Sequence, residues 1–323
     1  MTKIILWFKI IWAVLSSRSN QAFYDKISTF YDDVYVEHKV HAETILHKLN
    51  EIYSGREEET LILDLGCGTG MMTKILSEKG FKVVGVDISF SSLCVHQNHY
   101  PKHDLIQADA NFLPIADGSF DAVVCLGVWR HFPDVSKVLN EVSRILTSDG
   151  TFIVGYFPPA MAGSIELSQN WWGKLLIRLY QLVTQTLGYI DRADFFLEEE
   201  TVKMAKKKFT IMQKLESGFN RRILFTKNPL KSRSIEAKND IYPKNKEIKN
   251  TQMHEILRCP HCVTIDERMG HLKLIQNNWL ICQESECGRK YPIQKSIPLL
   301  LRGEGEKWIS VSKENLPDTL SRY

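Results

Sequence analysis

A short apolar strand followed by three alternating glycines is the strongest constraint on how this chain can fold. The strand is expected over 61–65, and Gly66, Gly68 and Gly70 follow it. Glycine adopts positive φ without strain, and because it has no Cβ a ligand can lie against its backbone. A helix expected over 71–79 would add unpaired amide donors at its start. The pattern therefore predicts a nucleotide-type binding turn between a buried strand and a helix.

Two common nucleotide-binding turns do not fit the spacing of these glycines. A dinucleotide fingerprint would need a third glycine where Met71 stands, and a P-loop would need a Gly-Lys-Ser/Thr ending, which is missing here. Asp64 lies just before the turn, where it either contacts a ligand or caps the turn and the next helix. Asp87 ends a second strand about twenty residues after Gly66, where nucleotide-binding α/β folds place the acceptor for a ribose hydroxyl.

Further strands alternate with helices along the middle of the chain. We expect strands over 81–87, 105–108, 122–127 and 151–155, a helix over 141–146 and two last strands over 209–215 and 221–226. Strands that alternate with helices of about a dozen residues indicate a parallel sheet. Cys67 and Cys125 lie on or beside these strands, and we interpret both as small buried apolar groups.

This ordered series resembles the class I S-adenosylmethionine (SAM) dependent methyltransferases, and within them the methyltransferase type 11 family, over about residues 21–228. The resemblance implies an α/β, Rossmann-like fold with a seven-stranded, mostly parallel sheet whose last strand is antiparallel. It also implies SAM as the cofactor, and in the family the position of Asp109 hydrogen-bonds the adenine amino group. The implied cofactor residues are Asp64, Gly66, Cys67, Gly68, Gly70, Asp87, Ile88, Asp109, Ala110 and Leu126.

The N-terminal residues carry a separate pattern. An apolar run over 4–15, broken by Lys9, is too short for a bilayer-spanning helix of about 20 residues, and no small-residue cleavage pattern follows it. With Lys3 and Arg18 at its ends and two tryptophans, it could lie in a membrane interface. The alternative is a helix packed on its own domain or on a partner.

Two aromatic pairs follow at a seven-residue step. Phe23-Tyr24 and Phe30-Tyr31 would lie on one face of a helix. In the resembled family this helix folds over the cofactor, so Tyr24 and Tyr31 are candidate lid residues. The alternative is an aromatic stripe buried in a core.

An insertion between the fifth and sixth strands covers about 157–208. It contains Trp171-Trp172 and then an apolar helical face, next to the expected acceptor site. Such a face favours an aromatic or lipid-like acceptor, although a helix that covers the core would show the same pattern.

Four cysteines near the C-terminal end have the spacing of metal ligands. Cys259 and Cys262 form one pair, and Cys282 and Cys287 follow after about twenty residues. Two thiol pairs joined by a hairpin can close a tetrahedral zinc site, although the gap in the second pair is longer than usual and leaves His261 as an alternative ligand. A domain of about 50 residues has little core of its own, so structural zinc would supply folding energy.

The segment over 287–300 resembles the zinc-ribbon activator proteins that bind and stabilise several tRNA, ribosomal RNA and release-factor methyltransferases. The resemblance implies an intramolecular docking role and leaves a substrate-binding role open. A polar, lysine-rich stretch with two prolines separates the two units and is expected to be a linker. The predicted division is an apolar N-terminal helix (1–20), a methyltransferase domain (21–228), a basic linker (229–252), a zinc-ribbon domain (253–303) and a tail (304–323).

Composition agrees with two domains. A chain of 323 residues with 44% hydrophobic side chains can bury a substantial core, and a net charge of +3 excludes a molecule built as a whole to bind polyanions. Seven cysteines, four of them close together, are not the framework of a secreted disulfide protein. We therefore expect a reducing, cytoplasmic location, with or without membrane contact through residues 4–15.

Three functions fit these patterns. The first is a SAM-dependent methyltransferase acting on oxygen or carbon of a small apolar acceptor, with His131 either the general base or a helix-start residue without a catalytic part. The second is an RNA or protein methyltransferase, favoured by the ribbon and the basic linker. Its amino-group versions lack their Asn/Asp-Pro-Pro-Tyr signature, because residues 127–130 read Gly-Val-Trp-Arg. The third is a non-catalytic scaffold, which the intact glycines and Asp87 disfavour.

Overall fold

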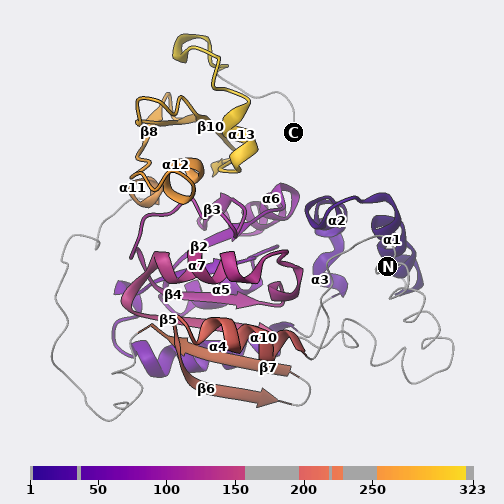
Figure 1. The fold of residues 1–323 in the computed structure, drawn as a ribbon. Coiled ribbons are helices and arrows are strands. Elements are labelled where there is room, and N and C mark those ends of the chain that lie inside the picture. The colour runs from indigo at the N-terminus through magenta and orange to yellow at the C-terminus, as the bar shows by residue number, and fades with distance from the viewer. Residues whose placement is uncertain (1–2, 35–37, 157–195, 218–219, 228–252, 318–323) are drawn as a thin grey trace.

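A seven-stranded sheet forms the centre of the larger part of the molecule (Figure 1). The computed structural model describes residues 3–34, 38–156, 196–217, 220–227 and 253–317. The strands are β1 (Leu61–Leu65), β2 (Lys82–Asp87), β3 (Asp104–Gln107), β4 (Phe120–Leu126), β5 (Leu146–Tyr156), β6 (Thr210–Ser217) and β7 (Asn220–Thr226), in the spatial order β3-β2-β1-β4-β5-β7-β6. Strands β1 to β5 pair in parallel, whereas β7 runs antiparallel to both β5 and β6. The predicted fold class is confirmed.

Two apolar layers cover the faces of this sheet because its central strands carry apolar side chains on both faces. Ile62 packs with α4 (His38–Tyr53) and α5 (Met71–Glu78), while its neighbour Leu63 packs with α7 (Val135–Ile145) on the other face. Successive strand side chains point to opposite faces, which explains this alternation. Among the described residues after the N-terminal region, this sheet is also accompanied by α6 (Phe90–His99) and α10 (Phe196–Ala205), with the short turns η2 (Glu57–Glu59) and η3 (Trp129–His131).

The N-terminal helices form a small cluster of their own beside the sheet (Figure 1). They are α1 (Lys3–Ser16), α2 (Asn20–Ile27), η1 (Ser28–Phe30) and α3 (Tyr31–Val34). The single helix expected across the two aromatic pairs is interrupted by η1. Even so, the Tyr24 and Tyr31 rings stay close, with centroids 6.2 Å apart, while Phe23 and Phe30 are buried in the N-terminal cluster.

A second, four-stranded antiparallel sheet forms the C-terminal unit, which we call the ribbon (residues 253–317). Its order is β11-β10-β9-β8, from β8 (Leu272–Ile275), β9 (Trp279–Cys282), β10 (Lys290–Gln294) and β11 (Ile297–Pro298). Its helical elements are α11 (Met253–Ile256), α12 (Pro260–Thr264), α13 (Arg302–Glu306) and η7 (Lys313–Asn315). Residues expected as a tail pack on this sheet up to residue 317: Trp279 contacts Trp308 and donates to the Pro317 carbonyl, and Leu316 is buried.

The ribbon stands on the edge of the large sheet above β3 (Figure 1). Leu299 forms a parallel bridge with Gln107 of β3, and the Leu300 amide donates to the Gln107 carbonyl at 2.9 Å. The Arg258 amide donates to the carbonyl of Pro114, in the loop after β3, at 2.8 Å. Ribbon side chains such as Leu300 belong to the same buried cluster as the sheet. The edge strand is thereby covered rather than exposed.

Some predicted features lie outside the described residues. They are the apolar face after Trp171-Trp172 within 157–195, the linker over 229–252 and residues 318–323. Within the part of the chain that is described, no helix has both the length and the apolar character needed to cross a bilayer.

Candidate functional site

A cavity of about 410 Å³ opens at the carboxyl ends of β1, β2 and β4. This is where open α/β sheets bind ligands, because the strand order reverses there. Seven of the predicted cofactor residues line the cavity: Gly66, Gly68, Asp87, Ile88, Asp109, Ala110 and Leu126. His131 and the candidate lid residues Tyr24 and Tyr31 line it too. The sheet therefore gathers residues from six separate stretches of sequence around one space.

The structure explains why glycine is needed at each of the first two positions of the turn. Gly66 has φ +80°, and a Cβ built there would lie 2.4 Å from Cγ1 of Val128. Gly68 has φ +51°, and a Cβ on it would meet nothing within 4 Å. Since Gly68 lines the cavity, this open space is where a ligand can approach the bare backbone.

Asp87 ties the turn to the end of β2. One carboxylate oxygen accepts from the Gly68 amide at 2.9 Å, and the other accepts from the Ser89 amide at 2.8 Å. Burial raises the pKa of this carboxyl group, and the two amide donors act in the opposite direction. A carboxylate can accept about four hydrogen bonds, so both oxygens keep capacity for ribose hydroxyls.

The loop after β3 presents an acceptor that the sequence interpretation missed. Asn111 donates through its amide side chain and its backbone to one oxygen of Asp109, at 2.8 and 2.9 Å. Its side-chain carbonyl is buried and has no hydrogen-bond partner in the described part of the chain. Asn111 lines the cavity and lies two residues after Asp109, which was the available signal. This acceptor suits an adenine amino group, so the residues present fit a nucleoside.

The other three predicted cofactor residues lie behind the cavity wall. Asp64 is 2% exposed and accepts from the Thr73 hydroxyl at 2.6 Å, which ties β1 to α5. Burial raises the pKa of Asp64 to about 7. Cys67 packs in the small apolar cluster that includes Leu299 of the ribbon. Gly70 has φ +101°, and a Cβ on it would lie 2.5 Å from the ring of His96.

Helix α2 is fastened over the cavity by polar contacts. One Asp25 carboxylate oxygen accepts from the Ser89 hydroxyl at 2.6 Å, and the Asn20 side chain donates to the His131 carbonyl at 3.0 Å. Further along, the Thr69 hydroxyl of the glycine turn donates to Asp32 at 2.5 Å. The N-terminal helices therefore form one wall of the cavity.

Tyr24 and His131 face each other within this wall. The Tyr24 hydroxyl lies 2.8 Å from Nε2 of His131, and Nε of Arg130 donates to the same nitrogen at 3.3 Å. A guanidinium N–H can only donate, so Nε2 carries a lone pair and the Tyr24 hydroxyl donates to it as well. With Nε2 as the acceptor, a neutral His131 imidazole would carry its proton on Nδ1. The pair can accept a proton from a group in the cavity.

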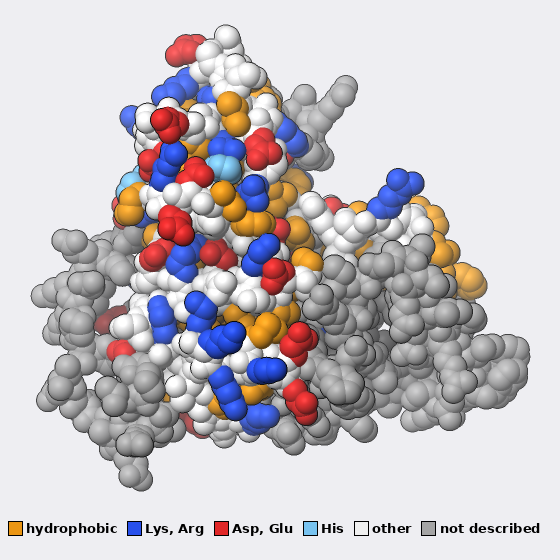
Figure 2. Space-filling view, in the orientation of Figure 1, with side chains coloured by type: hydrophobic (Ala, Val, Ile, Leu, Met, Phe, Trp, Pro, Cys, Tyr) orange, Lys and Arg blue, Asp and Glu red, His pale blue; other side chains and the backbone are white. Residues whose placement is uncertain are grey.

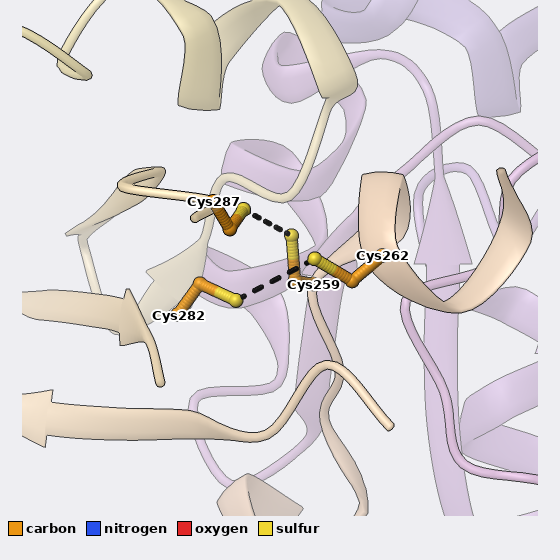
Figure 3. Close-up of side chains that lie close together, drawn as sticks. All are labelled: Cys259, Cys262, Cys282 and Cys287. Atoms are coloured by element: carbon orange, nitrogen blue, oxygen red, sulfur yellow. Dashed lines mark hydrogen bonds between the residues drawn. The ribbon is translucent and has the colours of Figure 1, made fainter. Parts of the chain in front are cut away.

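The four predicted metal ligands converge between α12 and the ribbon strands (Figure 3). Their sulfur atoms all lie within 4.8 Å of one another, with Cys259 to Cys287 and Cys262 to Cys282 both at 3.7 Å. Tetrahedral zinc with Zn–S bonds of about 2.3 Å requires sulfur separations of about 3.8 Å. The donor set therefore fits zinc. His261 instead places Nε2 3.5 Å from a carboxylate oxygen of Asp266, away from the four thiols.

Comparison with known proteins identifies the larger unit. Residues 63–154 match the family model described as "Methyltransferase domain". A demethylmenaquinone methyltransferase of Thermus thermophilus is 38% identical over 33% of this chain and 51% of its own length. A 2-phytyl-1,4-naphtoquinone methyltransferase of Thermosynechococcus vestitus is 25% identical over 47% of this chain and 70% of its own. The chain spans about half the length of the first curated relatives that it matches.

A solved structure offers a further comparison. The magnesium protoporphyrin IX methyltransferase of Synechocystis, crystallised with bound SAH, has a TM-score of 0.45 and 20% identity, over 61% of this chain and 86% of its own. The sheet order and the matched family model define the fold as that of a class I SAM-dependent methyltransferase. More narrowly, residues 63–154 match a methyltransferase domain, and this part of the chain has the sheet order of that fold.

Proposed function

We propose that this chain transfers the methyl group of SAM to an oxygen or carbon atom of a small, apolar acceptor. One observation carries the proposal: a single cavity is lined both by residues that fit a nucleoside and by a proton-accepting pair. Asp87 and Asn111 are suited to the ribose and the adenine. Tyr24 and His131 are suited to a hydroxyl or acidic carbon that must lose a proton when it is methylated.

The residues of the chain carry the proton and exclude water. Bound SAM supplies an activated methyl group on a sulfonium, so the transfer depends on alignment of the acceptor with that group. The acceptor proton passes to the Tyr24 oxygen as the Tyr24 proton passes to Nε2 of His131. Arg130 holds the neutral imidazole in place before the transfer, and its N–H would move off Nε2 once that nitrogen is protonated, while α2 closes the cavity above the pair. In this proposal the sulfur–methyl bond would break, with its electron pair left on sulfur, as the acceptor atom bonds the methyl carbon, and the imidazole would end protonated.

The apolar acceptor is favoured by the lining and by the relatives. Leu65, Val86, Leu126, Val128 and Phe132 contribute apolar surface to the cavity. The two curated relatives named above are quinone methyltransferases by name. A cytoplasmic location belongs to the same proposal, since thiolate ligands require a reducing compartment.

The ribbon is proposed to hold one structural zinc ion through Cys259, Cys262, Cys282 and Cys287. It is further proposed to act as an intramolecular activator-like module. The support for this role is its docking on β3: Leu300 is bonded to the strand whose end leads into the Asp109 loop. The predicted domain boundaries stay part of this proposal, with the ribbon extended to residue 317.

Methyl transfer from radiolabelled SAM tests the proposal directly. The full chain is incubated with a lipid-soluble cell extract and, separately, with total RNA and with protein. Label in the lipid-soluble fraction is expected, and label only in RNA or protein would instead establish the alternative function. Tyr24→Phe and His131→Gln are each expected to reduce kcat by about 10²-fold or more while SAM affinity stays nearly unchanged.

Matched substitutions control for general damage. Tyr100→Phe and His99→Gln make the same chemical changes on and just after α6, away from the cavity lining, and should leave kcat unchanged. Equal activity of Tyr24→Phe and the parent chain would remove the proton-transfer role. Absence of SAM binding by the parent chain would remove the proposed function altogether.

A further inference from the structure

Helix α1 is apolar on two faces, and the described residues of the chain pack against only one of them. Leu6, Ile10, Ala13 and Val14 are buried against α2 in the N-terminal cluster. The opposite stripe, which we call the outer face, consists of Ile5, Phe8, Trp12 and Leu15, which are 48%, 69%, 62% and 58% exposed. Single exposed apolar residues are ordinary, but four on one stripe of one helix mark an interaction surface.

Basic groups surround the outer face. Lys9 and Arg18 are exposed, and the Lys26 ammonium lies 5.1 Å from the centre of the Trp12 ring while it donates to the Ser16 carbonyl. Helix α1 itself contains no acidic residue. On the face shown in Figure 2, hydrophobic and basic side chains lie together at the edge where Figure 1 places α1 and α2.

The acidic groups of the N-terminal helices are mostly directed elsewhere. Asp25 accepts from Ser89, and Asp32 accepts from Thr69, so both carboxylates face the methyltransferase domain. Asp33 is the remaining acidic residue of α2 and α3. The charge around the outer face is therefore positive, which complements an anionic surface.

The chain that follows α1 leads directly into the wall of the cavity. Arg18, Ser19, Asn20 and Gln21 line that cavity and follow α1 directly in the chain. A surface that receives α1 would lie next to this wall. An amphiphilic molecule could then reach the cavity without crossing bulk water.

We propose that the outer face of α1 docks on the surface of an anionic lipid bilayer, with the helix lying in the interface. Apolar side chains would enter the boundary between headgroups and acyl chains, and Lys9, Arg18 and Lys26 would meet the headgroups. With 14 residues, α1 is shorter than the roughly 20 that span a bilayer, so docking is peripheral. Docking itself is independent of methyl transfer, whereas delivery of an apolar acceptor rests on the proposed function.

Co-sedimentation of the full chain with vesicles tests this docking. One set of vesicles is phosphatidylcholine alone, and the other contains equal parts of phosphatidylcholine and phosphatidylglycerol. Binding is expected to be stronger to the anionic set and to weaken with added salt. The double variant Phe8→Glu/Trp12→Glu should lower the partition coefficient at least about tenfold, because two large apolar side chains leave the interface.

Control variants with the same added charge at another site distinguish loss of the outer face from a general effect of negative charge. Met269→Glu/Ile309→Glu alters two ribbon residues that are 64% and 44% exposed, and it should bind vesicles nearly as the parent chain does. A milder pair of variants is Lys9→Glu and its control Lys273→Glu. Lys9→Glu should weaken binding to the anionic vesicles alone, and Lys273→Glu should leave binding to both vesicle sets unchanged. This second pair keeps the test valid if the first variant disturbs folding of α1.

Three results would overturn the proposal. They are no binding to either vesicle set, equal binding by Phe8→Glu/Trp12→Glu and the parent chain, and a dimer in light scattering that this variant abolishes. The last result would show that a second copy of the chain covers the outer face. Calorimetric titration of SAM into the same preparations keeps failure of docking distinct from failure of the proposed function.

Discussion

Substitution of Asp87 by asparagine changes charge at the point where β2 meets the glycine turn. Each carboxylate oxygen receives one backbone N–H, from Gly68 at 2.9 Å and from Ser89 at 2.8 Å. An asparagine side chain has only one acceptor oxygen. Whichever way its amide is turned, one of these two backbone amides loses its acceptor and faces another donor.

The expected magnitude follows from these contacts. A hydrogen bond to a charged group contributes about 1.5–3 kcal/mol, and tenfold in affinity corresponds to about 1.4 kcal/mol. Loss of the carboxylate as acceptor for the ribose should therefore weaken SAM binding by roughly 10- to 100-fold. The amide left without an acceptor should lower the free energy of unfolding by a further ~1–3 kcal/mol, even without ligand.

Isothermal titration with SAM and urea unfolding of the same preparations measure the two effects. Asp104→Asn is the matched control, since this exposed aspartate begins the neighbouring strand β3 and does not line the cavity. It should leave SAM affinity unchanged. Affinity of the Asp87→Asn variant within about a factor of two of the parent chain would refute the assignment of Asp87 as the ribose acceptor.

Three further changes test other parts of the structure. Gly66→Ala should abolish SAM binding, since its Cβ would lie 2.4 Å from Val128. The control Gly118→Ala is also at positive φ but has no neighbour within 4 Å, so it should lower stability only by the backbone strain of ~1–2 kcal/mol. Equal SAM affinities of the two variants would contradict this account of the turn. Removal of metal by a chelator should unfold the ribbon, because zinc binding contributes about 10 kcal/mol or more to small zinc domains. Circular dichroism and metal analysis measure this, and a metal-free ribbon that stays folded would refute the zinc site. The pKa of Asp64 is 3.8 in the unfolded chain and about 7 in the folded one, so the unfolded state binds fewer protons between these values and stability falls as pH rises through them. Relative to Asp64→Asn, the free energy of unfolding in urea should therefore decrease from pH 4 to 7. A constant difference between the two proteins would rule out the raised pKa.

Unfolding of the ribbon is also expected to lower the affinity for SAM. The Leu300 amide holds the Gln107 carbonyl, and Gln107 in turn donates through its side chain to the carbonyl of Ile88, which lines the cavity. Leu299 packs in the cluster that contains Cys67 of the glycine turn. In the chelation experiment, SAM affinity should therefore fall together with the ribbon signal and return when zinc is restored.

Much of the fold could be predicted because its signals are local. Apolar runs with glycine turns between them place β1, β2 and β4 within a residue or two of their observed bounds, and the final antiparallel pair follows the resemblance. The exception in the N-terminal region is η1, which interrupts the helix expected across the aromatic pairs. The seven-residue step predicts a shared side for Tyr24 and Tyr31, but it contains no information about a tighter turn between them.

The sequence by itself determined the residues whose role depends on spacing: the glycine turn, Asp87 and the four cysteines. Their geometry is set by a few neighbouring bonds or by one hairpin, so a short pattern is enough to predict it. The tertiary structure alone decided the contacts between distant segments. Tyr24 and His131 are 107 residues apart, and they meet because α2 contacts η3, the turn that follows β4. The ribbon on β3 and the uncovered face of α1 likewise depend on which surfaces pack together, a property of the whole fold that no local pattern encodes.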